Sequence, residues 1–301
     1  MSEISVVVVS YNSRADLKRS LPAVAGAERE VIVVDNASTD ESRELVRSRF
    51  PGVELLELHE NVGYGAACNE GLRAASAPLI LLLNPDAWPV GDGIEQLAAC
   101  AMRRPGLGAV APQLHSPDGR EQQTLVGLPT RWWTGRPAIT SASRGHLRPR
   151  LRSRQGQGFL VGAALLLRRA ALEQVGGFDP SFFMFYEEVD LCSRLQQGGW
   201  SIDVCAEARF VHVGGTATRR NWARMYREQL RSHLRFLAKH QGLAAAEQAR
   251  RYLPWALRAR MLARRGEERR AYREAALWLA SSPVTVLLDN GGPQDPSIDK
   301  L

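Results

Sequence analysis

The sequence predicts an α/β fold, with a Rossmann-like, mostly parallel sheet flanked by helices, and three observations support this. Several aliphatic or β-branched runs lack polar alternation, as strands buried on both faces do. The clearest runs are residues 4–10, 31–34 and 79–83. Between the first two, Leu17, Leu21 and Val24 recur at helical spacing within residues 16–25. Polar turn residues close each run, and this alternation of strand and helix indicates a doubly wound sheet.

The later part of the chain continues the alternation. We expect further strands at residues 53–58, 108–112, 161–167, 202–205 and 210–213. Helices are expected after Asn61, at residues 170–175 and from Glu187 onward. Residues 131–154 hold seven arginines and no acid, which predicts a long loop, either a solvated insertion or a flap over the site.

A carboxylate follows the most apolar strand of the sheet. Residues 79–83 are five consecutive aliphatic residues, and Pro85 ends the strand because it cannot donate to a ladder. Asp86 therefore lies just beyond the carboxyl end of a central strand, where open α/β sheets bind their ligands. A carboxylate there can hold a hard divalent cation. The alternative is a turn in which Asp86 only caps the next helix.

Three acids follow a run of aromatic residues at 182–186. Glu187, Glu188 and Asp190 would lie in the first turn of a helix, where negative charge is favourable for structural reasons alone. Beside the aromatic run, the same acids could also lie in a desolvated cleft. Burial raises a carboxyl pKa, and such a group is suited to general-base catalysis.

Several motifs together resemble one family. They are Val9-Ser10-Tyr11-Asn12, Val34-Asp35-Asn36-Ala37-Ser38-Thr39-Asp40, Asn61-Val62-Gly63-Tyr64-Gly65, Asn84-Pro85-Asp86 and the later Gly176-Gly177-Phe178-Asp179 with its acids. In this order the chain resembles inverting glycosyltransferases of family 2, over about residues 4–215. The resemblance implies a GT-A fold, and the Asn-Pro-Asp form resembles the rhamnosyltransferase-like branch.

The resemblance assigns expected roles to single residues. The donor side would comprise Tyr11, Asp35, Asn36, Asn61, Gly63, Gly65, Asn84 and Asp86. Asp86 and His212 would hold Mn²⁺ or Mg²⁺, and Gly162 and Asp190 would lie on the acceptor side. By position Glu188 would be the base, but this chain has Glu-Glu where the family has Glu-Asp, so Glu187 remains a competitor.

The expected activity is metal-dependent, inverting transfer of a sugar from a nucleoside-diphosphate donor, with dTDP-L-rhamnose as the donor that the branch suggests. The acceptor would be a hydroxyl of a glycan or polyprenyl-linked molecule in cell-wall or surface polysaccharide synthesis. Two alternatives are a sugar-nucleotide nucleotidyltransferase and a non-enzymatic nucleic-acid-binding protein. The first would show a glycine-rich loop with a basic residue near the N-terminus, and Ser10-Tyr11-Asn12-Ser13 does not match it. The second leaves the acidic motifs unexplained, so no nucleic-acid partner is expected.

The positive charge is concentrated near the C-terminus. Residues 219–275 hold 16 Lys and Arg against 5 Glu, a net charge of +11 in a chain of +7. We expect a catalytic domain at 1–218, with a nucleotide-sugar half at about 1–115 and an acceptor half at about 156–218. A basic helical extension at 219–288 and a disordered tail at 289–301 would follow.

Arginines form one helical stripe in this extension, opposite mostly apolar residues. The stripe comprises Arg220, Arg224, Arg227, Arg231 and Arg235. Either it meets an anionic membrane while Trp222, Tyr226 and Leu230 insert, or the apolar face packs on protein and the stripe is solvated. The membrane alternative would make residues 219–275 a peripheral membrane contact.

Four scattered cysteines without a Cys-x-x-Cys pair predict a reduced, cytosolic environment. No run of 18 apolar residues occurs, so no membrane span is expected. The predicted location is cytoplasmic, with contact at the inner face of the cell membrane if the extension binds lipid.

Overall fold

The computed structural model describes residues 3–26, 29–129, 158–214, 222–281 and 283–289, which divide into two compact units. The sheet unit lies within residues 1–128, 145–180 and 187–214. The helical unit lies within residues 129–144, 181–186 and 215–301. The expected loop at 131–154, the domain boundary at 218 and, except for Asp289, the expected tail at 289–301 lie outside the described residues.

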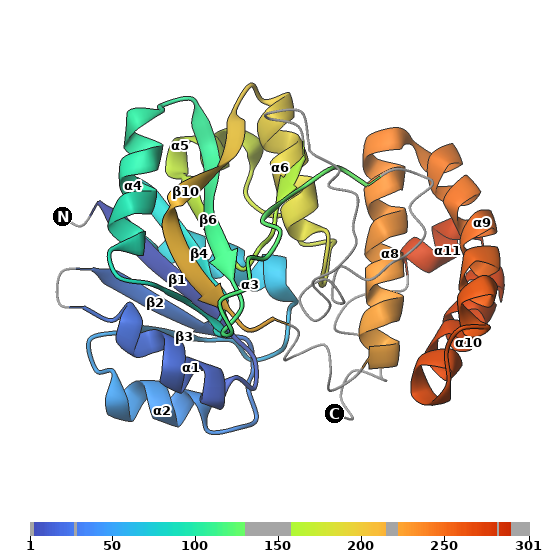
Figure 1. The fold of residues 1–301 in the computed structure, drawn as a ribbon, viewed down its shortest axis with the longest axis horizontal. Coiled ribbons are helices and arrows are strands. Elements are labelled where there is room, and N and C mark those ends of the chain that lie inside the picture. Colours follow the sequence, from blue (N-terminus) through green and yellow to red (C-terminus); the bar gives the residue numbers. More distant parts are fainter. Residues whose placement is uncertain (1–2, 27–28, 130–157, 215–221, 282, 290–301) are drawn as a thin grey trace. The chain divides into compact units, whose positions relative to one another are not determined.

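Among the described residues, eight strands form the main sheet, in the order β3, β2, β1, β4, β9, β6, β10, β5 (Figure 1). Their bounds are β1 Ile4–Ser10, β2 Glu30–Asp35, β3 Glu54–Glu57, β4 Leu79–Leu83, β5 Ala87–Pro89, β6 Leu107–His115, β9 Ala164–Arg168 and β10 Ser201–His212. β1 pairs in parallel with β2 and β4, as do β2 with β3 and β6 with β10. β9 runs antiparallel between β4 and β6, and β5 runs antiparallel to β10. The prediction of a mostly parallel α/β sheet flanked by helices is confirmed.

Helices cover both faces of the sheet because its strands are apolar on both faces. In β1, Val6 and Val8 enter one core, whereas Val7 and Val9 enter the other. Helices α1 (Arg14–Ser20), α2 (Ser42–Arg49) and α4 (Gly93–Arg103) contribute to the first core. Helices α3 (Tyr64–Ala74), α5 (Arg169–Val175) and α6 (Glu187–Gln197) contribute to the second. The unit also contains a short 3-10 helix, η1 (Leu21–Ala23), and a two-stranded antiparallel ribbon of β7 (Leu125–Val126) and β8 (Phe159–Leu160).

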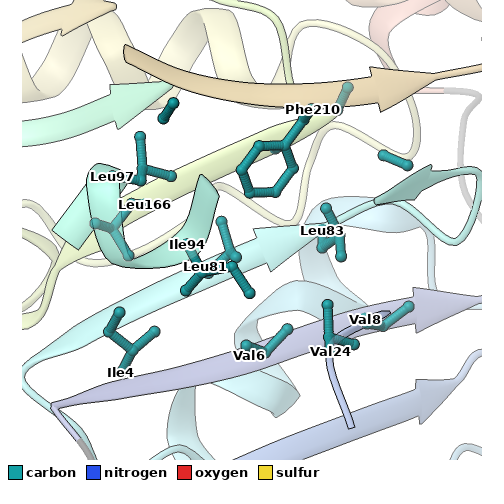
Figure 2. Packing of buried hydrophobic residues seen from close by; sticks show 14 of the residues in the cluster. Ile4, Val6, Val8, Val24, Leu81, Leu83, Ile94, Leu97, Leu166 and Phe210 are labelled. Carbon is teal, nitrogen blue, oxygen red and sulfur yellow. The ribbon is translucent and has the colours of Figure 1, made fainter. Parts of the chain in front are cut away.

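The first core fixes the strands that carry the site. Figure 2 shows Leu81 and Leu83 of β4 with Ile94 and Leu97 of α4, and Phe210 of β10 on the same side of the sheet. All five side chains are buried. Burying a side chain of this size contributes roughly 1.5–3 kcal/mol, so this packing holds β4 and β10 firmly in place.

Two strand predictions need correction. Residues 202–205 and 210–213 were expected as separate strands, but both belong to β10, whose register shifts between Cys205 and Arg209. The interruption of the apolar pattern marks this irregularity within one strand rather than the end of a strand. The strand expected at 161–167 begins only at Ala164, after a turn that contains Gly162.

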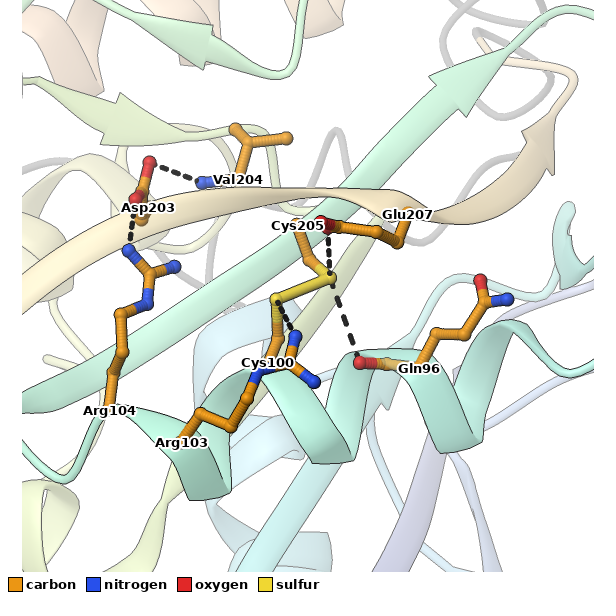
Figure 3. The surroundings of a disulfide bond; sticks show 8 residues. All are labelled: Gln96, Cys100, Arg103, Arg104, Asp203, Val204, Cys205 and Glu207. Atoms are coloured by element: carbon orange, nitrogen blue, oxygen red, sulfur yellow. Dashed lines mark hydrogen bonds and ion pairs between the residues drawn. A yellow bond between two sulfur atoms is a disulfide. The ribbon is translucent and has the colours of Figure 1, made fainter.

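Two of the four cysteines form a disulfide, which corrects the prediction of reduced thiols for this pair. Cys100 of α4 and Cys205 of β10 are joined across 105 residues of sequence (Figure 3). The sequence spacing gave no sign of it, because the packing of α4 on β10 brings the two together. Cys68 and Cys192 are buried free thiols.

The helical unit has a core of its own. It contains α8 (Trp222–Gln241), α9 (Leu243–Met261), α10 (Gly266–Ser281) and α11 (Val284–Asp289). The apolar faces of all four contribute to one cluster that includes Leu234, Leu253 and Leu279. Within the described ranges, no helix combines the length and apolar character that crossing a bilayer requires.

The apolar face of α8 packs on protein, which favours the second of the two alternatives over insertion of Tyr226 and Leu230 into a membrane. Both side chains are fully buried in the helical core. The arginine stripe is also partly engaged: Arg231 is buried beside Glu228 and donates to the carbonyl of Leu287 at 3.2 Å. Arg235 donates to the carbonyls of Ser181 and Leu288. Arg220 lies outside the described residues.

Candidate active site

Asp35 ends β2 and is almost fully buried. Its Oδ1 accepts from the backbone N–H of Ser38 at 2.9 Å and from Nε of Arg43 at 2.6 Å. Its Oδ2 is buried and has no hydrogen-bond partner among the described residues. A buried acceptor without a partner is costly. Asp35 therefore offers one carboxylate oxygen to a ligand that carries an N–H or O–H donor.

Asn36, expected at the donor base, is engaged by the chain itself. Its Nδ2 donates to Oδ1 of Asn61 at 2.9 Å and to the carbonyl of Gly63 at 3.3 Å. Its Oδ1 accepts from the N–H of Val62 at 3.0 Å. Asn36 and Asn61 thus fix the loop before α3 and leave little capacity for direct ligand contact.

The loop after β1 is held against the loop after β2. Asn12 adopts φ 50°, and its Oδ1 accepts from the backbone N–H of Thr39 at 2.7 Å. The backbone N–H of Asn12 donates to Oγ of Ser38 at 2.9 Å. Tyr11, at the end of β1, is exposed. These bonds bring together the two sequence motifs that end β1 and β2.

The two glycines expected on the donor side have different structural roles. Gly63 adopts φ 90°, which glycine tolerates, and its carbonyl accepts the first bond of α3. Gly65 lies against α6: a Cβ there would lie 3.2 Å from Cβ of Glu187 and 3.3 Å from Cβ of Phe178. Gly65 therefore permits the close approach of α3 to α6, and this packing explains the glycine without any ligand.

Tyr64 joins α3 to the end of β4. Its hydroxyl donates to Oδ1 of Asn84 at 2.8 Å. The pKa of Tyr64 is raised well above its ordinary value, first by burial and then by nearby Cys68 and Glu187. Tyr64 thus stays protonated and holds Asn84 in a fixed orientation.

Asp86 and His212 come together at the end of the sheet. β5 and β10 pair there, with His212 opposite Ala87. Asp86 Oδ2 accepts from the N–H of Gly214 at 3.1 Å, and Asp86 Oδ1 lies 3.5 Å from Nε2 of His212. Both side chains are largely buried. The structure therefore brings together the two residues expected at the metal.

Gln122 fixes the tautomer of the His212 ring. The amide Nε2 of Gln122 donates to the carbonyl of His212 at 2.7 Å, which places its Oε1 3.0 Å from Nδ1 of His212. Nδ1 therefore carries the proton, and the lone pair of Nε2 faces Asp86. Burial lowers the pKa of His212, although the charge of Asp86 acts in the opposite sense. At neutral pH two acceptor atoms thus face each other, an arrangement that fits a cation.

Apart from the pair of Asp86 and His212, one group of three potential ligands occurs within the described ranges. Cys100, Cys205 and Glu207 have ligand atoms within 4.8 Å of one another. Because the two sulfurs are joined in a disulfide, this group does not compete with Asp86 and His212 as a cation site.

The two glutamates that open α6 have different surroundings. Glu187 is buried, and its pKa is raised well above its ordinary value, first by desolvation and then by the charge of Glu188. Glu188 is only half-buried. Cβ and Cγ of Glu188 lie 3.6 Å from the position that a Cβ would take at Gly162. Glu188 is therefore the less buried acid of the pair, although its Oε2 is buried, and Gly162 lies beside it.

Asp190, which was expected on the acceptor side, forms an ion pair within α6. It is fully buried, and its Oδ2 accepts from Nε of Arg194 at 2.7 Å. Arg194 also donates to the carbonyls of Val175 and Gly177. The i,i+4 spacing within α6 allows this ion pair, and Arg194 ties α6 to the end of α5.

Three residues at the site were not anticipated from the sequence. They are Arg43, which binds Asp35; Tyr64, which binds Asn84; and Gln122, which orients His212. Tyr64 lies within one of the quoted motifs, so its position in that motif could have indicated that it belongs to the site. Gln122 is 90 residues from His212 and lies in no motif, so nothing in the sequence pointed to it.

Solved structures define the class of protein. A mannosyltransferase from Pyrobaculum calidifontis, solved with GDP-Man and Mn²⁺, matches with a TM-score of 0.58 and 19% identity, covering 96% of this chain and 88% of that one. S. aureus TarS residues 1–349, solved with UDP-GlcNAc, matches with a TM-score of 0.57 and 17% identity, covering 95% and 84%. The fold is therefore the GT-A fold of glycosyltransferases.

Sequence comparison gives the family. The model described as glycosyl transferase family 2 matches residues 5–176. An N-acetylglucosaminyl-diphospho-decaprenol L-rhamnosyltransferase of Mycobacterium tuberculosis is 32% identical over 282 residues, which cover 85% of this chain and 89% of that protein. A low-salt glycan biosynthesis hexosyltransferase of Haloferax volcanii, Agl10, is 25% identical over 219 residues, covering 70% and 67%. The chain belongs to glycosyl transferase family 2 and is a glycosyltransferase.

Proposed function

We propose that this glycosyltransferase moves L-rhamnose from dTDP-L-rhamnose, with inversion, to a hydroxyl of a polyprenyl-linked or other glycan acceptor in cell-surface polysaccharide synthesis. The name of the M. tuberculosis relative supports both the sugar and the lipid-linked acceptor, since that protein is similar over most of its length. Asp35 supports a base with an N–H donor, such as thymine, because its Oδ2 is a buried acceptor without a partner among the described residues.

The observation that carries the proposal is the pair of acceptor atoms on Asp86 and His212, 3.5 Å apart. These atoms fit Mn²⁺ or Mg²⁺, because the coordination distance of about 2.1 Å for Mg²⁺ allows two neighbouring ligands to lie roughly 3–4 Å apart. Asp86 would supply a carboxylate oxygen and His212 a neutral imidazole nitrogen. A bound divalent ion neutralises charge on the departing diphosphate.

Glu188 is the proposed general base. It would take the proton from the acceptor hydroxyl while that oxygen bonds to the anomeric carbon and the bond to the diphosphate breaks. A single displacement of this kind inverts the anomeric centre and needs no nucleophile from the protein. Glu187 is less suited to the role, because its burial favours the protonated form, which cannot accept a proton.

A thermal-shift panel tests the proposal. A ligand that binds the native state raises its stability, by about 2.7 kcal/mol at 100 times its Kd. We expect dTDP-L-rhamnose with Mn²⁺ to raise the Tm more than UDP-GlcNAc or GDP-mannose with Mn²⁺, and EDTA to remove the effect. A larger shift with another nucleotide sugar would reject the proposed donor. An equal shift in EDTA would reject the metal.

A further inference from the structure

The short segment before the acid pair has an unusual backbone. Phe185 and Tyr186 adopt φ 66° and φ 68°, a left-handed conformation that is unfavourable for bulky side chains. Two such residues in succession persist only where neighbouring contacts hold them. The next residue in the chain is Glu187, the first residue of α6.

Helix α8 supplies these contacts within the helical unit, to which residues 181–186 belong. Oγ of Ser232 donates to the carbonyl of Met184 at 2.9 Å. The hydroxyl of Tyr186 and Nδ1 of His233 are joined by a hydrogen bond of 3.0 Å. The ring of Tyr186 also packs on Phe236, with 5.8 Å between centroids. Residues from two adjacent turns of α8 thus hold the left-handed turn.

His233 is suited to a fixed structural bond rather than to proton transfer. It is fully buried, and desolvation lowers its pKa to about 3. The imidazole is therefore neutral at neutral pH, and the bond to Tyr186 joins two neutral groups. Such a bond does not alter as pH changes around neutrality.

We propose that His233 is a positioning residue for sugar transfer: by holding Tyr186, it sets the backbone from which Glu187 and Glu188 project. The link runs along the chain, because Tyr186 is bonded directly to Glu187. The proposal rests on the proposed role of Glu188 as base. It gives the helical extension a part in the reaction that does not depend on its charge or on a membrane.

Variants of the two bonded side chains test the proposal. Tyr186→Phe removes only the hydroxyl, and His233→Leu removes the ring nitrogens at similar volume. His233→Asn restores a polar group near the position of Nδ1 and serves as the conservative rescue. The matched control is Tyr226→Phe, which removes a buried hydroxyl from the same helix; that hydroxyl interacts with Arg260, and its ring packs on Trp222 and Tyr272.

Hydrogen exchange gives a readout that is independent of any donor. In Tyr186→Phe and His233→Leu, we expect the amides of residues 185–188 to exchange about tenfold faster or more, because the local opening that exposes them becomes easier. Tyr226→Phe should leave these amides unchanged. Unchanged exchange at residues 185–188 in both test variants would overturn the proposal, whatever the reaction proves to be.

Kinetics give the second readout, as release of dTDP from dTDP-L-rhamnose with Mn²⁺. Because misplacement by about 1 Å can cost roughly 10²-fold, kcat should fall by about one to two orders of magnitude in His233→Leu and recover partly in His233→Asn. The Kd for dTDP with Mn²⁺ should stay within about twofold of wild type, since the donor side is untouched. Equal losses of kcat in Tyr226→Phe would contradict positioning. If wild type released no dTDP, the proposed function would fail, and hydrogen exchange would still decide the backbone claim.

Discussion

At the scale of single residues, the acid pair that opens α6 is distinguished by burial rather than by sequence. Both residues are glutamates, so their order alone left the base undecided. Glu187 is packed against Gly65 and carries a raised pKa, whereas Glu188 is half-buried beside Gly162. The difference in environment assigns the less buried carboxylate to Glu188 and the neutral, packed carboxyl to Glu187.

This assignment predicts different outcomes when each glutamate is replaced by glutamine. Glu188→Gln should lose about 10²–10⁴-fold in kcat and keep donor affinity, because a general base acts on the chemical step. Glu187→Gln should keep most activity, since an amide resembles a protonated carboxyl in size and polarity. The measurement is dTDP release alongside donor binding for both variants. A loss confined to Glu187→Gln would exchange the two roles.

The burial of His233 predicts how the free energy of unfolding depends on pH. Its pKa is lowered to about 3 in the folded protein, against about 6.5 in an unfolded chain, so the unfolded state binds more protons between these values. The contribution of His233 to the free energy of unfolding is therefore fully present above pH 6.5 and is lost progressively as the pH falls toward 3. From pH 6.5 to pH 5 the loss in free energy of unfolding should be roughly 1–2 kcal/mol. Urea unfolding of wild type and His233→Leu measures it. The same pH dependence in both proteins would contradict the buried, neutral imidazole.

The positions of several candidate site residues could be read from the sequence, whereas those of their partners could not. Asp35, Asn84, Asp86 and His212 lie at strand ends, and strand ends follow from apolar runs and breakers. Their partners come from distant elements, as Gln122 does for His212. Such contacts depend on how loops cross the sheet edge, which no local pattern encodes. Asn36 and Gly65 were expected at the ligand, but each is occupied by packing or hydrogen bonds within the chain.

At the scale of elements, α3 is placed by a glycine in its last turn. A Cβ at Gly71 would overlap Cγ1 of Val7 in β1 and lie 3.0 Å from Cγ2 of Val34 in β2. Gly71 therefore lets α3 lie directly on the sheet, and Tyr64 at the other end of the helix reaches Asn84. Helix propensity alone would favour alanine at this position by about 1 kcal/mol.

The close approach at Gly71 should determine whether alanine at this position raises or lowers the free energy of unfolding. Gly71→Ala should lower the free energy of unfolding by about 1–3 kcal/mol, because overpacking outweighs the gain in helix propensity. Gly52→Ala is the matched control, since no atom lies within 4 Å of a Cβ there. Urea unfolding of both variants provides the measurement. A stabilised Gly71→Ala protein would show that α3 does not rest on β1 as described.

Element boundaries followed from the sequence wherever apolar runs were long and uninterrupted, as in β1 and β4. They failed where polar residues interrupt a continuous strand, as in β10 across residues 205–209. For α8, the sequence allowed both a lipid-facing and a protein-facing apolar stripe, because amphipathic periodicity is the same in both cases. Burial of Tyr226 and Leu230 decides for protein. The disulfide between Cys100 and Cys205 was equally invisible, as it depends on the packing of α4 on β10.

At the scale of the whole molecule, the order of motifs along the chain follows from the topology of the sheet. β1, β2 and β4 are parallel neighbours, so the polar residues after them meet at one edge. β10 brings His212 to the same edge by pairing with β5, directly after Asp86. A fold of this kind gathers residues 35, 84, 86 and 212 at one end of the sheet without any long-range sequence signal. The central claim is that the pair of Asp86 and His212 makes donor binding depend on a metal.

Isothermal titration of dTDP-L-rhamnose, with Mn²⁺ and with EDTA, tests that claim most directly. Wild type and the control Asp118→Ala, which alters an exposed carboxylate paired with Arg120, should bind the donor tightly only with Mn²⁺. Asp86→Ala should bind weakly and equally in both conditions, at least about tenfold weaker than wild type with Mn²⁺, because loss of a metal ligand or its support typically costs 10–100-fold in affinity. Unchanged Mn²⁺-dependent affinity in Asp86→Ala would contradict the account.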